Sequence, residues 1–372
     1  MTETPKTPLH AVHTALGARM VPFAGFEMPV SYTGIIEEHR AVRERVGIFD
    51  VSHMGEVDVS GPGTFDFLNR SVTNDCSKLV DNAVLYTVMC REDGKTIDDL
   101  LVARISEDRA LLVVNASNIE KDLKHLQSLL PEEGVSLSDR SDAYGLLAVQ
   151  GPDSRELMKT CESFAPVRDR LDELAYYRLI RFETGGDEVV VSRTGYTGEV
   201  GFEVFVPAAR TEDFWNEIVE TGQKFEISPV GLAARDTLRF EASYCLYGHE
   251  LDDETTPLEA GLSWVVKLKK RNGFVGRDAL AAEKENGSRK KLVGLELEGR
   301  NIARQDFPVM QVEEVVGRVT SGTFSPTLGK SLCMAYIDAD RVGDDQSYSI
   351  QVRKKYVGAR VVSLPFYSSR AK

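Results

Sequence analysis

The strongest constraint on the fold comes from three β-rich runs that follow one another with very short connections. They occupy residues 84–90, 96–104 and 110–115. A parallel pairing needs a crossover of roughly a dozen residues or more, and neither connection is long enough for one. The first connection also contains Asp93-Gly94, a pair preferred in two-residue type I′ hairpins. The three runs are therefore predicted to form an antiparallel meander.

The expected turns also predict which side chains share a face of this sheet. Pairing across the loop at 105–109 places Asp99 opposite Asn115, and the type I′ turn places Tyr86 on the same face. Asp98 then lies on the other face, because successive strand residues alternate. A phenol, a carboxylate and an amide on an otherwise apolar face would suit a polar heterocyclic ligand. A hydrogen-bonded structural cluster is the alternative, and a slip of one residue would exchange the two faces.

Helical patterns alternate with the strands of this first region. Residues 35–47 predict an exposed amphipathic helix, because a few apolar side chains recur among charges. Ser117 and Glu120 have the spacing of a capping box and predict the start of another helix. Further helices are expected near 208–222 and 230–242. This mixture predicts an α+β region.

The sequence changes character after a charged, turn-rich segment at 269–291. Beyond it, short β patterns are separated by Gly and Pro, which predicts a small all-β barrel or sandwich of about 80 residues. We therefore divide the chain into a mixed region at 1–280 and a C-terminal β-barrel domain at 285–372.

Composition excludes several classes of protein. The net charge of −13 argues against broad nucleic-acid binding, and no apolar run reaches the length of a membrane span. The five cysteines are scattered without a CxxC motif, which favours reduced thiols over a disulfide framework or a zinc site. No HExxH motif, P-loop or strand-linked GxGxxG occurs, so no metal or nucleotide site is expected. The first residues lack the features of a targeting peptide, and we expect a cytoplasmic protein of bacterial type.

A series of longer motifs runs in order from about Thr7 to Tyr367. It includes MVPFAGFEMPV (20–30), IDDLLV (97–102), RTGYTGEVGFEV (193–204), GLAARDTLRFEASYCLYGHELDDETTPLEAGLSWVVKL (231–268) and GRVTSGTFSPTLGKSLCMAYI (317–337). Through this ordered set of motifs the chain resembles the glycine cleavage system T-protein family, whose members are tetrahydrofolate-dependent aminomethyltransferases. The resemblance implies two interlocked ferredoxin-like folate-binding lobes and a C-terminal β-barrel around a central folate-binding opening.

The resemblance also implies the site residues. Asp99 falls on the family's catalytic carboxylate. The folate- and substrate-binding positions fall on Met54, Tyr86, Asn115, Tyr196, Glu203, Arg235, Tyr244 and Tyr367. Arg235 and Arg239 share a helix face, and we expect one to hold folate's carboxylate or pair with Glu203 and the other to be structural. The tail reads FYSSR, which departs from the family's usual FYKR.

The implied reaction transfers the methylene carbon of an aminomethyl group to tetrahydrofolate and releases ammonia. The group arrives on the lipoyl arm of a carrier, the H-protein, so the expected partners are this carrier and tetrahydrofolate, without metal, flavin, nucleic acid or membrane. Asp99 would act as a base or stabilise a developing cation. Removing the charge of Asp99 should therefore slow turnover greatly, whereas Asp98→Asn should cost little.

Three alternative functions compete with this one. A related branch serves iron–sulfur cluster maintenance through a KGC motif, but here Cys245 lacks the preceding Lys-Gly. Related domains fused to flavin dehydrogenases need a flavin domain for which this chain has no room. A third alternative is a non-catalytic module that recruits the carrier. Substitution of Asp99 distinguishes it from an enzyme, because a non-catalytic module should tolerate the change.

A local basic surface is expected where an acidic carrier docks on this acidic chain. The candidate residues are Lys267, Lys269, Lys270, Arg271, Lys290, Lys291, Lys354 and Lys355.

Overall fold

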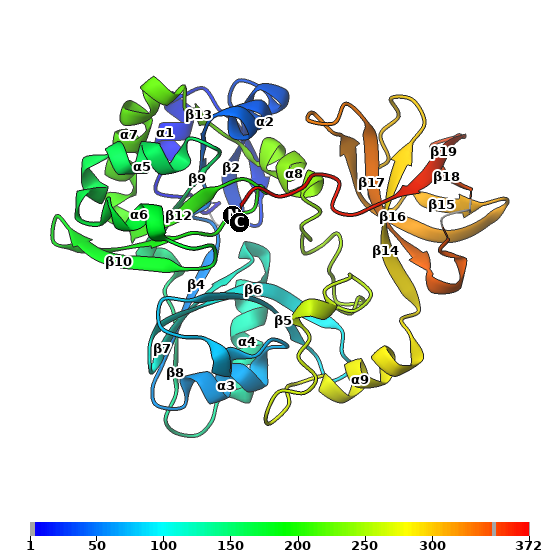
Figure 1. Cartoon of the computed structure of the whole chain (residues 1–372), viewed down its shortest axis with the longest axis horizontal. Helices are drawn as coiled ribbons and strands as arrows, with labels where there is room; N and C mark the ends of the chain where they lie inside the picture. The colour runs from blue at the N-terminus through cyan, green and yellow to red at the C-terminus, as the bar shows by residue number, and fades with distance from the viewer. Residues whose placement is uncertain (1–3, 344–346, 372) are drawn as a thin grey trace.

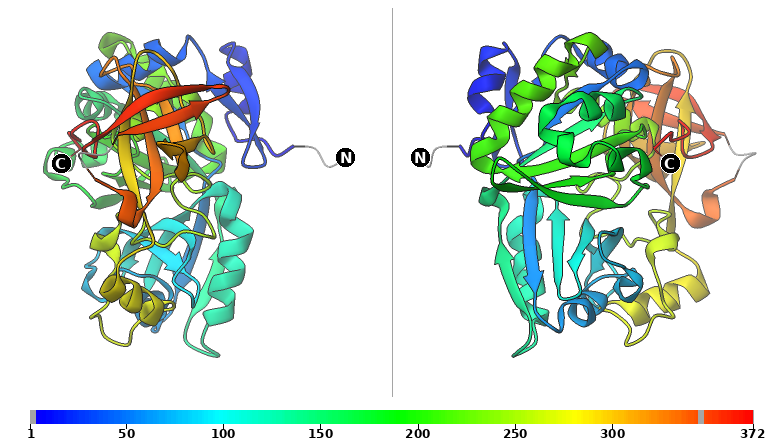
Figure 2. Two further views of the ribbon diagram at one scale, coloured as in Figure 1. Left: turned by 90° about the vertical axis from the view of Figure 1, so that its right-hand side faces the viewer. Right: turned by 60° about the vertical axis from the view of Figure 1, so that its left-hand side comes forward.

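The computed structural model describes residues 4–343 and 347–371 and shows three units around a common centre (Figure 1). Two of them are α/β lobes built on separate sheets, and the third is a closed β-barrel. Views from the two sides show the barrel on one flank and the lobes one above the other (Figure 2). No helix in the described ranges is long and apolar enough to cross a membrane.

The first lobe contains the predicted meander. Its five-stranded sheet has the order β5-β6-β7-β4-β8. The strands are β4 (Gly55–Ser60), β5 (Val84–Cys90), β6 (Thr96–Ser106), β7 (Arg109–Val114) and β8 (Ser136–Asp139). Helices α3 (Thr64–Ser71) and α4 (Ile119–Leu129) supply apolar side chains to the core on one face, which includes Leu68, Leu100, Leu112 and Leu126.

The predicted register is confirmed, but the predicted turn is wrong. Val88 pairs with Asp99 and Leu101 with Val113, as expected. Gly94 alone has a positive φ, of 83°, whereas a type I′ turn needs two such residues. The N–H of Gly94 bonds the carbonyl of Arg91, so the connection is one residue longer than predicted. A bulge between Met89 and Cys90 compensates for that residue and restores the register.

The second lobe has a six-stranded sheet in the order β10-β11-β12-β9-β3-β13. Its strands are β3 (Gly47–Asp50), β9 (Tyr144–Gln150), β10 (Leu179–Thr184), β11 (Asp187–Ser192), β12 (Gly201–Pro207) and β13 (Ser228–Pro229). Its helices are α1 (His10–Ala15), α5 (Ser154–Thr160), α6 (Arg170–Glu173) and α7 (Thr211–Gly222). Trp215 and Phe214 of α7 are fully buried in the core on one face of this sheet.

The two lobes are interlocked because consecutive strands belong to different sheets. β3 lies in the second sheet, and β4, a few residues later, lies in the first. The free faces of the two sheets form a shared apolar core, in which Ala103 and Leu111 of the first meet Leu146 and Phe205 of the second. This core joins the two sheets into one body, and it places the Asp99 face of β6 toward the second lobe.

A hairpin, helices α2, α8 and α9, and the barrel complete the fold. The hairpin is β1 (Arg19–Phe23) and β2 (Phe26–Ser31), and the helices are α2 (Ile35–Glu44) and α8 (Leu232–Glu241). Helix α9 (Arg277–Asn286) leads into the barrel, whose order is β14-β17-β16-β15-β18-β19. Its strands are β14 (Lys290–Leu297), β15 (Pro308–Gln311), β16 (Glu314–Phe324), β17 (Ser331–Asp338), β18 (Tyr348–Val352) and β19 (Lys355–Val362).

Two helix expectations need correction. α2 is not an exposed helix, because Glu38, His39 and Arg43 are buried. His39 and Arg43 contact α8 and the loop after β16, and Glu38 accepts the backbone N–H of Gly231 at the start of α8. α4 has no capping box: its first residue is Ile119, and no side chain caps it. Asn118 stands at the cap position, but its side-chain amide donates to Asp98 instead.

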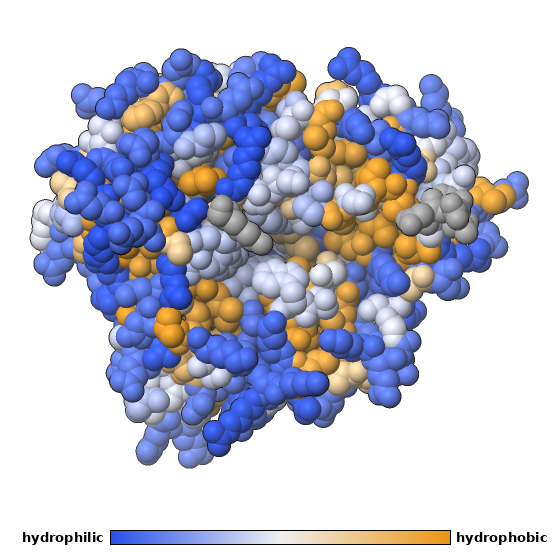
Figure 3. All heavy atoms as spheres, viewed as in Figure 1, coloured by the Kyte–Doolittle hydropathy of each residue, from blue (hydrophilic) through white to orange (hydrophobic). Residues whose placement is uncertain are grey.

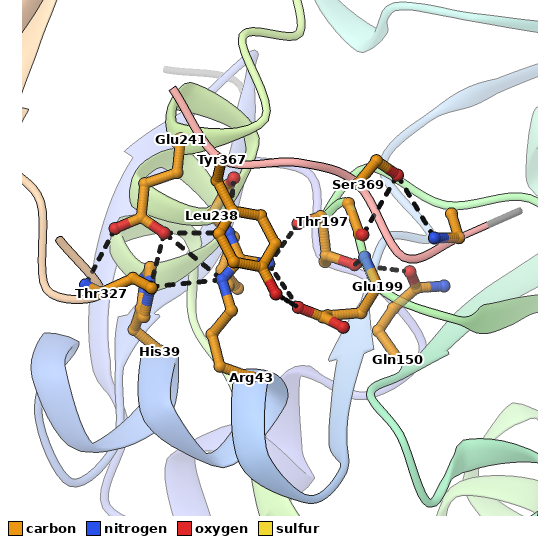
Figure 4. Close-up of polar contacts among 12 residues, drawn as sticks. His39, Arg43, Gln150, Thr197, Glu199, Leu238, Glu241, Thr327, Tyr367 and Ser369 are labelled. Carbon is orange, nitrogen blue, oxygen red and sulfur yellow. Dashed lines mark hydrogen bonds and ion pairs between the residues drawn. The ribbon is translucent and has the colours of Figure 1, made fainter. Parts of the chain in front are cut away.

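A buried polar cluster ties these parts together (Figure 4). The Glu241 carboxylate, at the end of α8, accepts hydrogen bonds from Arg43 of α2 at 3.0 and 3.3 Å and lies 3.2 Å from Nε2 of His39. Ser325 and the backbone N–H of Thr327, in the loop after β16, donate to its other oxygen. Burial opposes ionisation of Glu241, but His39 and these donors outweigh it and lower its pKa to about 2.

We predict that Glu241→Ala will lower the free energy of unfolding by about 3–5 kcal/mol, because Arg43 and His39 lose their buried partner. Urea denaturation followed by far-UV circular dichroism measures this. The control is Glu226→Ala, since Glu226 pairs with Arg45 while 69% exposed and should cost no more than about 1 kcal/mol. Equal losses in the two variants would contradict the assignment.

Candidate active site

The site is built around Asp99 on the face of β6 that points to the second lobe. The Tyr86 hydroxyl donates to Oδ2 of Asp99 at 2.9 Å, and Asn115 Nδ2 donates to Oδ1 at 3.0 Å. Burial and the charge of Asp98 raise the pKa of Asp99 to about 7. The structure thus brings together the three polar side chains that the register predicted, and it holds both carboxylate oxygens in place.

An exposed tryptophan extends this site. Trp264, in the turn Ser263–Val265, stacks on Tyr86 with ring centroids 5.7 Å apart and an angle of 24°. It is 56% exposed, which is unusual for so large an apolar side chain. The family motif that contains Trp264 suggested a place close enough to folate to report its binding. The contact with Tyr86 itself arises only because the loop after α8 folds back onto β5.

The second lobe and α8 add aromatic and charged groups. The Arg235 guanidinium lies 4.5 Å from the centroid of the Tyr196 ring, and that ring lies 5.9 Å from Tyr244. The Tyr196 hydroxyl donates to the carbonyl of Cys245, which fixes the ring. Burial lowers the pKa of Arg235, and the negative charge of Glu203 counteracts this. Burial raises the pKa of Tyr196, and the charge of Asp99 adds to this rise, whereas the charges of Arg239 and Arg235 oppose it. These residues are therefore linked electrostatically to Asp99.

The two predicted arginines, Arg235 and Arg239, have different roles. Arg239 is fully buried and bonds Glu250 at 2.7 Å and Ser321 at 2.9 Å, so it is the structural one. Arg235 forms no ion pair within 4–343 and 347–371. Glu203 accepts a hydrogen bond from Thr194, and burial raises its pKa.

The remaining two predicted residues lie at the margins. Met54 is half-buried and packs against the core between the sheets. The Tyr367 hydroxyl donates to Glu199 at 2.7 Å, and Arg43 lies 4.1 Å from the centroid of its ring. Tyr367 thus belongs to the Glu241 cluster and not to the group around Asp99.

The open face of the molecule is hollowed where the three units meet (Figure 3). A separate cleft of about 670 Å³ lies between the β1–β2 turn and the start of α4, and none of the predicted site residues lines it. Within the described ranges, no cluster of His, Cys, Asp and Glu side chains could hold a metal ion.

Two family models together cover most of the chain. Residues 9–270 match the GCVT N-terminal domain, and residues 290–368 match the glycine cleavage T-protein C-terminal barrel domain. The chain belongs to the glycine cleavage T-protein family. The predicted α+β fold with its C-terminal barrel is confirmed by the crystal structure of the glycine cleavage system aminomethyltransferase T from Bartonella henselae. That structure superposes with a TM-score of 0.90 at 30% identity over 99% of both chains.

Curated relatives agree over nearly the whole length. The chain is 49% identical to an aminomethyltransferase of Rubrobacter xylanophilus, with 97% of this chain and 94% of the relative aligned. It is 45% identical to an aminomethyltransferase of Halothermothrix orenii, with 97% and 99% aligned. Our chain is thus an aminomethyltransferase of the glycine cleavage system, which rules out the iron–sulfur, flavin-dehydrogenase and non-catalytic alternatives.

The raised pKa of Asp99 predicts an unusual pH dependence of stability. Asp99 ionises near pH 4 in an unfolded chain but near pH 7 when folded. Its ionisation therefore lowers stability progressively as pH rises from about 4 to about 7, and the loss is constant above that. The melting temperature of Asp99→Asn should rise relative to wild type over this range and then level off. Asp340→Asn, at an exposed aspartate, should show no such trend.

Proposed function

We propose that tetrahydrofolate binds in the central recess and that Asp99 is the catalytic carboxylate of the transfer. The observation that carries this is the Asp99 carboxylate itself, held by Tyr86 and Asn115, with the exposed Trp264 stacked on Tyr86. A carboxyl group whose pKa lies near 7 can accept a proton at neutral pH, and its charge can stabilise a developing cation.

The reaction moves one carbon. The aminomethyl carbon leaves the sulfur of a lipoyl arm and joins tetrahydrofolate, ammonia departs, and the sulfur keeps the electron pair as a dihydrolipoyl thiol. The protein's part is to align the two reactants and exclude water, because positioning can supply much of the rate. Tyr86, whose pKa is raised well above its usual range by burial and by Asp99, remains a neutral hydrogen-bond donor throughout.

The charges around the recess fit a folate. Arg235, which has no ion pair in the described chain, suits an anionic group such as folate's glutamate carboxylate. Glu203 suits the amino-pyrimidine edge of a pterin, which presents N–H donors to a carboxylate. Tyr196, Tyr244 and Trp264 offer ring faces for stacking. Met54 and Tyr367 remain proposed contacts at the margins of the recess.

The lipoylated H-protein is the proposed donor of the aminomethyl group. The basic surface suggested for its docking must be revised, because Lys270 is only 8% exposed. Its ammonium donates to the carbonyls of Val72 at 2.5 Å and Asn74 at 2.7 Å, so it anchors the loop to the first lobe. Lys267, Lys269 and Arg271 beside it are exposed and keep their place in the proposal.

We also propose a division of the chain into domains and a location for the protein. Residues 1–280 form the folate-binding region, and residues 285–372 form the barrel domain. The protein acts in the cytoplasm, with neither metal nor flavin.

Folate binding is expected to change the fluorescence of Trp264. The chain has two tryptophans, and Trp215 is buried in the core of the second lobe. Titration with tetrahydrofolate should therefore alter the wild-type signal far more than that of Trp264→Phe, which also corrects for light absorbed by the ligand. ATP serves as a control ligand. Identical titration curves for the two proteins would contradict binding beside Tyr86.

Asp99→Asn is expected to lower the rate of carrier-dependent transfer by about 10²–10⁴-fold, since the amide can neither accept the proton nor carry the charge. Folate affinity should change little, because the amide keeps the size of the side chain and hydrogen bonds to its neighbours. Single-turnover kinetics with lipoylated carrier measures the rate. A rate near wild type would refute the role of Asp99.

A further inference from the structure

Two more acids lie directly behind Asp99 and have no assigned role. Asp98, the next residue on β6, points to the helix-covered face of the sheet, where Asp122 of α4 meets it. Both side chains have 0% exposure. Buried carboxylates are costly unless they are paired or hydrogen-bonded. The way in which this pair is satisfied therefore shows what it can do.

Three N–H groups converge on Asp98. Asn115 Nδ2 and Asn118 Nδ2 donate to its Oδ1 at 2.8 and 2.6 Å, and the backbone N–H of Asn115 donates to its Oδ2 at 3.1 Å. Hydrogen bonds of this kind favour the charged form of a carboxyl group. The negative charge of the pair therefore resides on Asp98.

Asp122 completes the pair as a neutral acid. Neither of its oxygens receives an N–H or hydroxyl donor from the described chain. Burial and the charge of Asp98 raise its pKa to about 11, against the opposing charge of Lys121. Burial also raises the pKa of Asp98, so the two acids hold one proton between them at neutral pH. A protonated Asp122 can donate it as a hydrogen bond to Asp98.

Asn115 connects this pair to the reaction side of the sheet. Its side-chain amide donates to Asp98 at 2.8 Å and to Asp99 at 3.0 Å. If the Asn115 amide were rotated by 180°, its oxygen would point at both carboxyl groups and be repelled by the charge of Asp98. That charge therefore fixes the amide orientation in which Asn115 donates to Asp99. That charge also acts directly on Asp99 and, after burial, contributes to its raised pKa.

Other ionisable groups surround these carboxyls on both sides of the sheet. The groups that interact electrostatically with Asp99 are Tyr86, Tyr177, Tyr196, Cys245, Asp98 and Asp122. Lys121 and Tyr247 act on Asp98 and Asp122 from the other side of the sheet. Lys121 bonds the Tyr247 hydroxyl at 2.6 Å.

We propose that Asp98 is a positioning residue for the transfer: its charge, retained because Asp122 carries the proton, locks Asn115, orients Asp99 and makes Asp99 a stronger proton acceptor. This rests on the proposed role of Asp99. It revises the expectation from sequence that Asp98→Asn would cost little.

The test compares Asp98→Asn with wild type in single-turnover rate from pH 5.5 to 9, at saturating tetrahydrofolate. Loss of the charge should move the inflection attributed to Asp99 to lower pH by roughly one unit, the lower end for a neighbouring charge. The plateau rate should fall by roughly 10-fold, and the dissociation constant of tetrahydrofolate should change by less than about 3-fold. Glu56→Gln, which removes another buried acid of the same sheet, is the control with an unshifted inflection.

A purely structural role gives a different result. Asp98→Asn would then lower the melting temperature but keep the wild-type inflection and plateau, and that outcome overturns the proposal. Should Asp98→Asn fail to fold, Asn118→Ala replaces it. That variant removes one of the three donors that keep Asp98 charged, so the inflection should move in the same direction by less, and an unmoved inflection overturns the proposal.

Failure of the underlying function would be visible separately. If Asp99→Asn retained the wild-type rate and inflection, then Asp99 would not be the titrating group, whatever Asp98→Asn did. If Asp99→Asn abolished the inflection and Asp98→Asn left it unmoved, only the role of Asp98 would be wrong.

Discussion

The buried carboxylate of Glu241 is the interaction on which the arrangement of this protein depends. It stands at the end of α8, where α2, the barrel loop at 325–327 and the C-terminal tail converge. The tail is held there twice, because the backbone N–H of Tyr367 donates to the carbonyl of Glu241 at 2.7 Å and its hydroxyl reaches Glu199. A charge in this position has no access to water, so it is stable only if every segment supplies its partner. The cluster therefore specifies how the barrel and tail dock on the lobes.

The lobes themselves are joined by apolar packing, and the site lies at the edge of that packing. β6 has one face toward helices α3 and α4 and the other toward the second sheet. Asp98 and Asp99 are consecutive residues of β6, so one lies on each of these two faces. Because side chains alternate along a strand, these two adjacent acids have distinct roles. Asp98 accepts hydrogen bonds from the segment that leads into α4, and Asp99 faces the recess.

The site concentrates features that a stable protein ordinarily avoids. Three acids lie close together, an arginine has no ion pair in the described chain, and a tryptophan is half exposed. Such groups destabilise a fold, and they persist where binding or catalysis requires them. The surrounding network compensates locally: Asn115 and Asn118 satisfy Asp98, Tyr86 and Asn115 satisfy Asp99, and a shared proton reduces the charge of the pair.

The sequence alone determined the register of the meander, the faces of Asp98 and Asp99, and the family. Period-two alternation and short connections leave few alternative strand pairings. The predicted register is correct although the predicted turn type is wrong, because a bulge compensates for the extra residue. What only the tertiary structure decided depends on contacts between distant segments. Trp264 reaches Tyr86 across about half the chain, Lys270 turns inward to Val72 and Asn74, and Asp122 meets Asp98 through α4. Local sequence patterns report burial and periodicity, but a partner supplied by another element is set by packing in three dimensions.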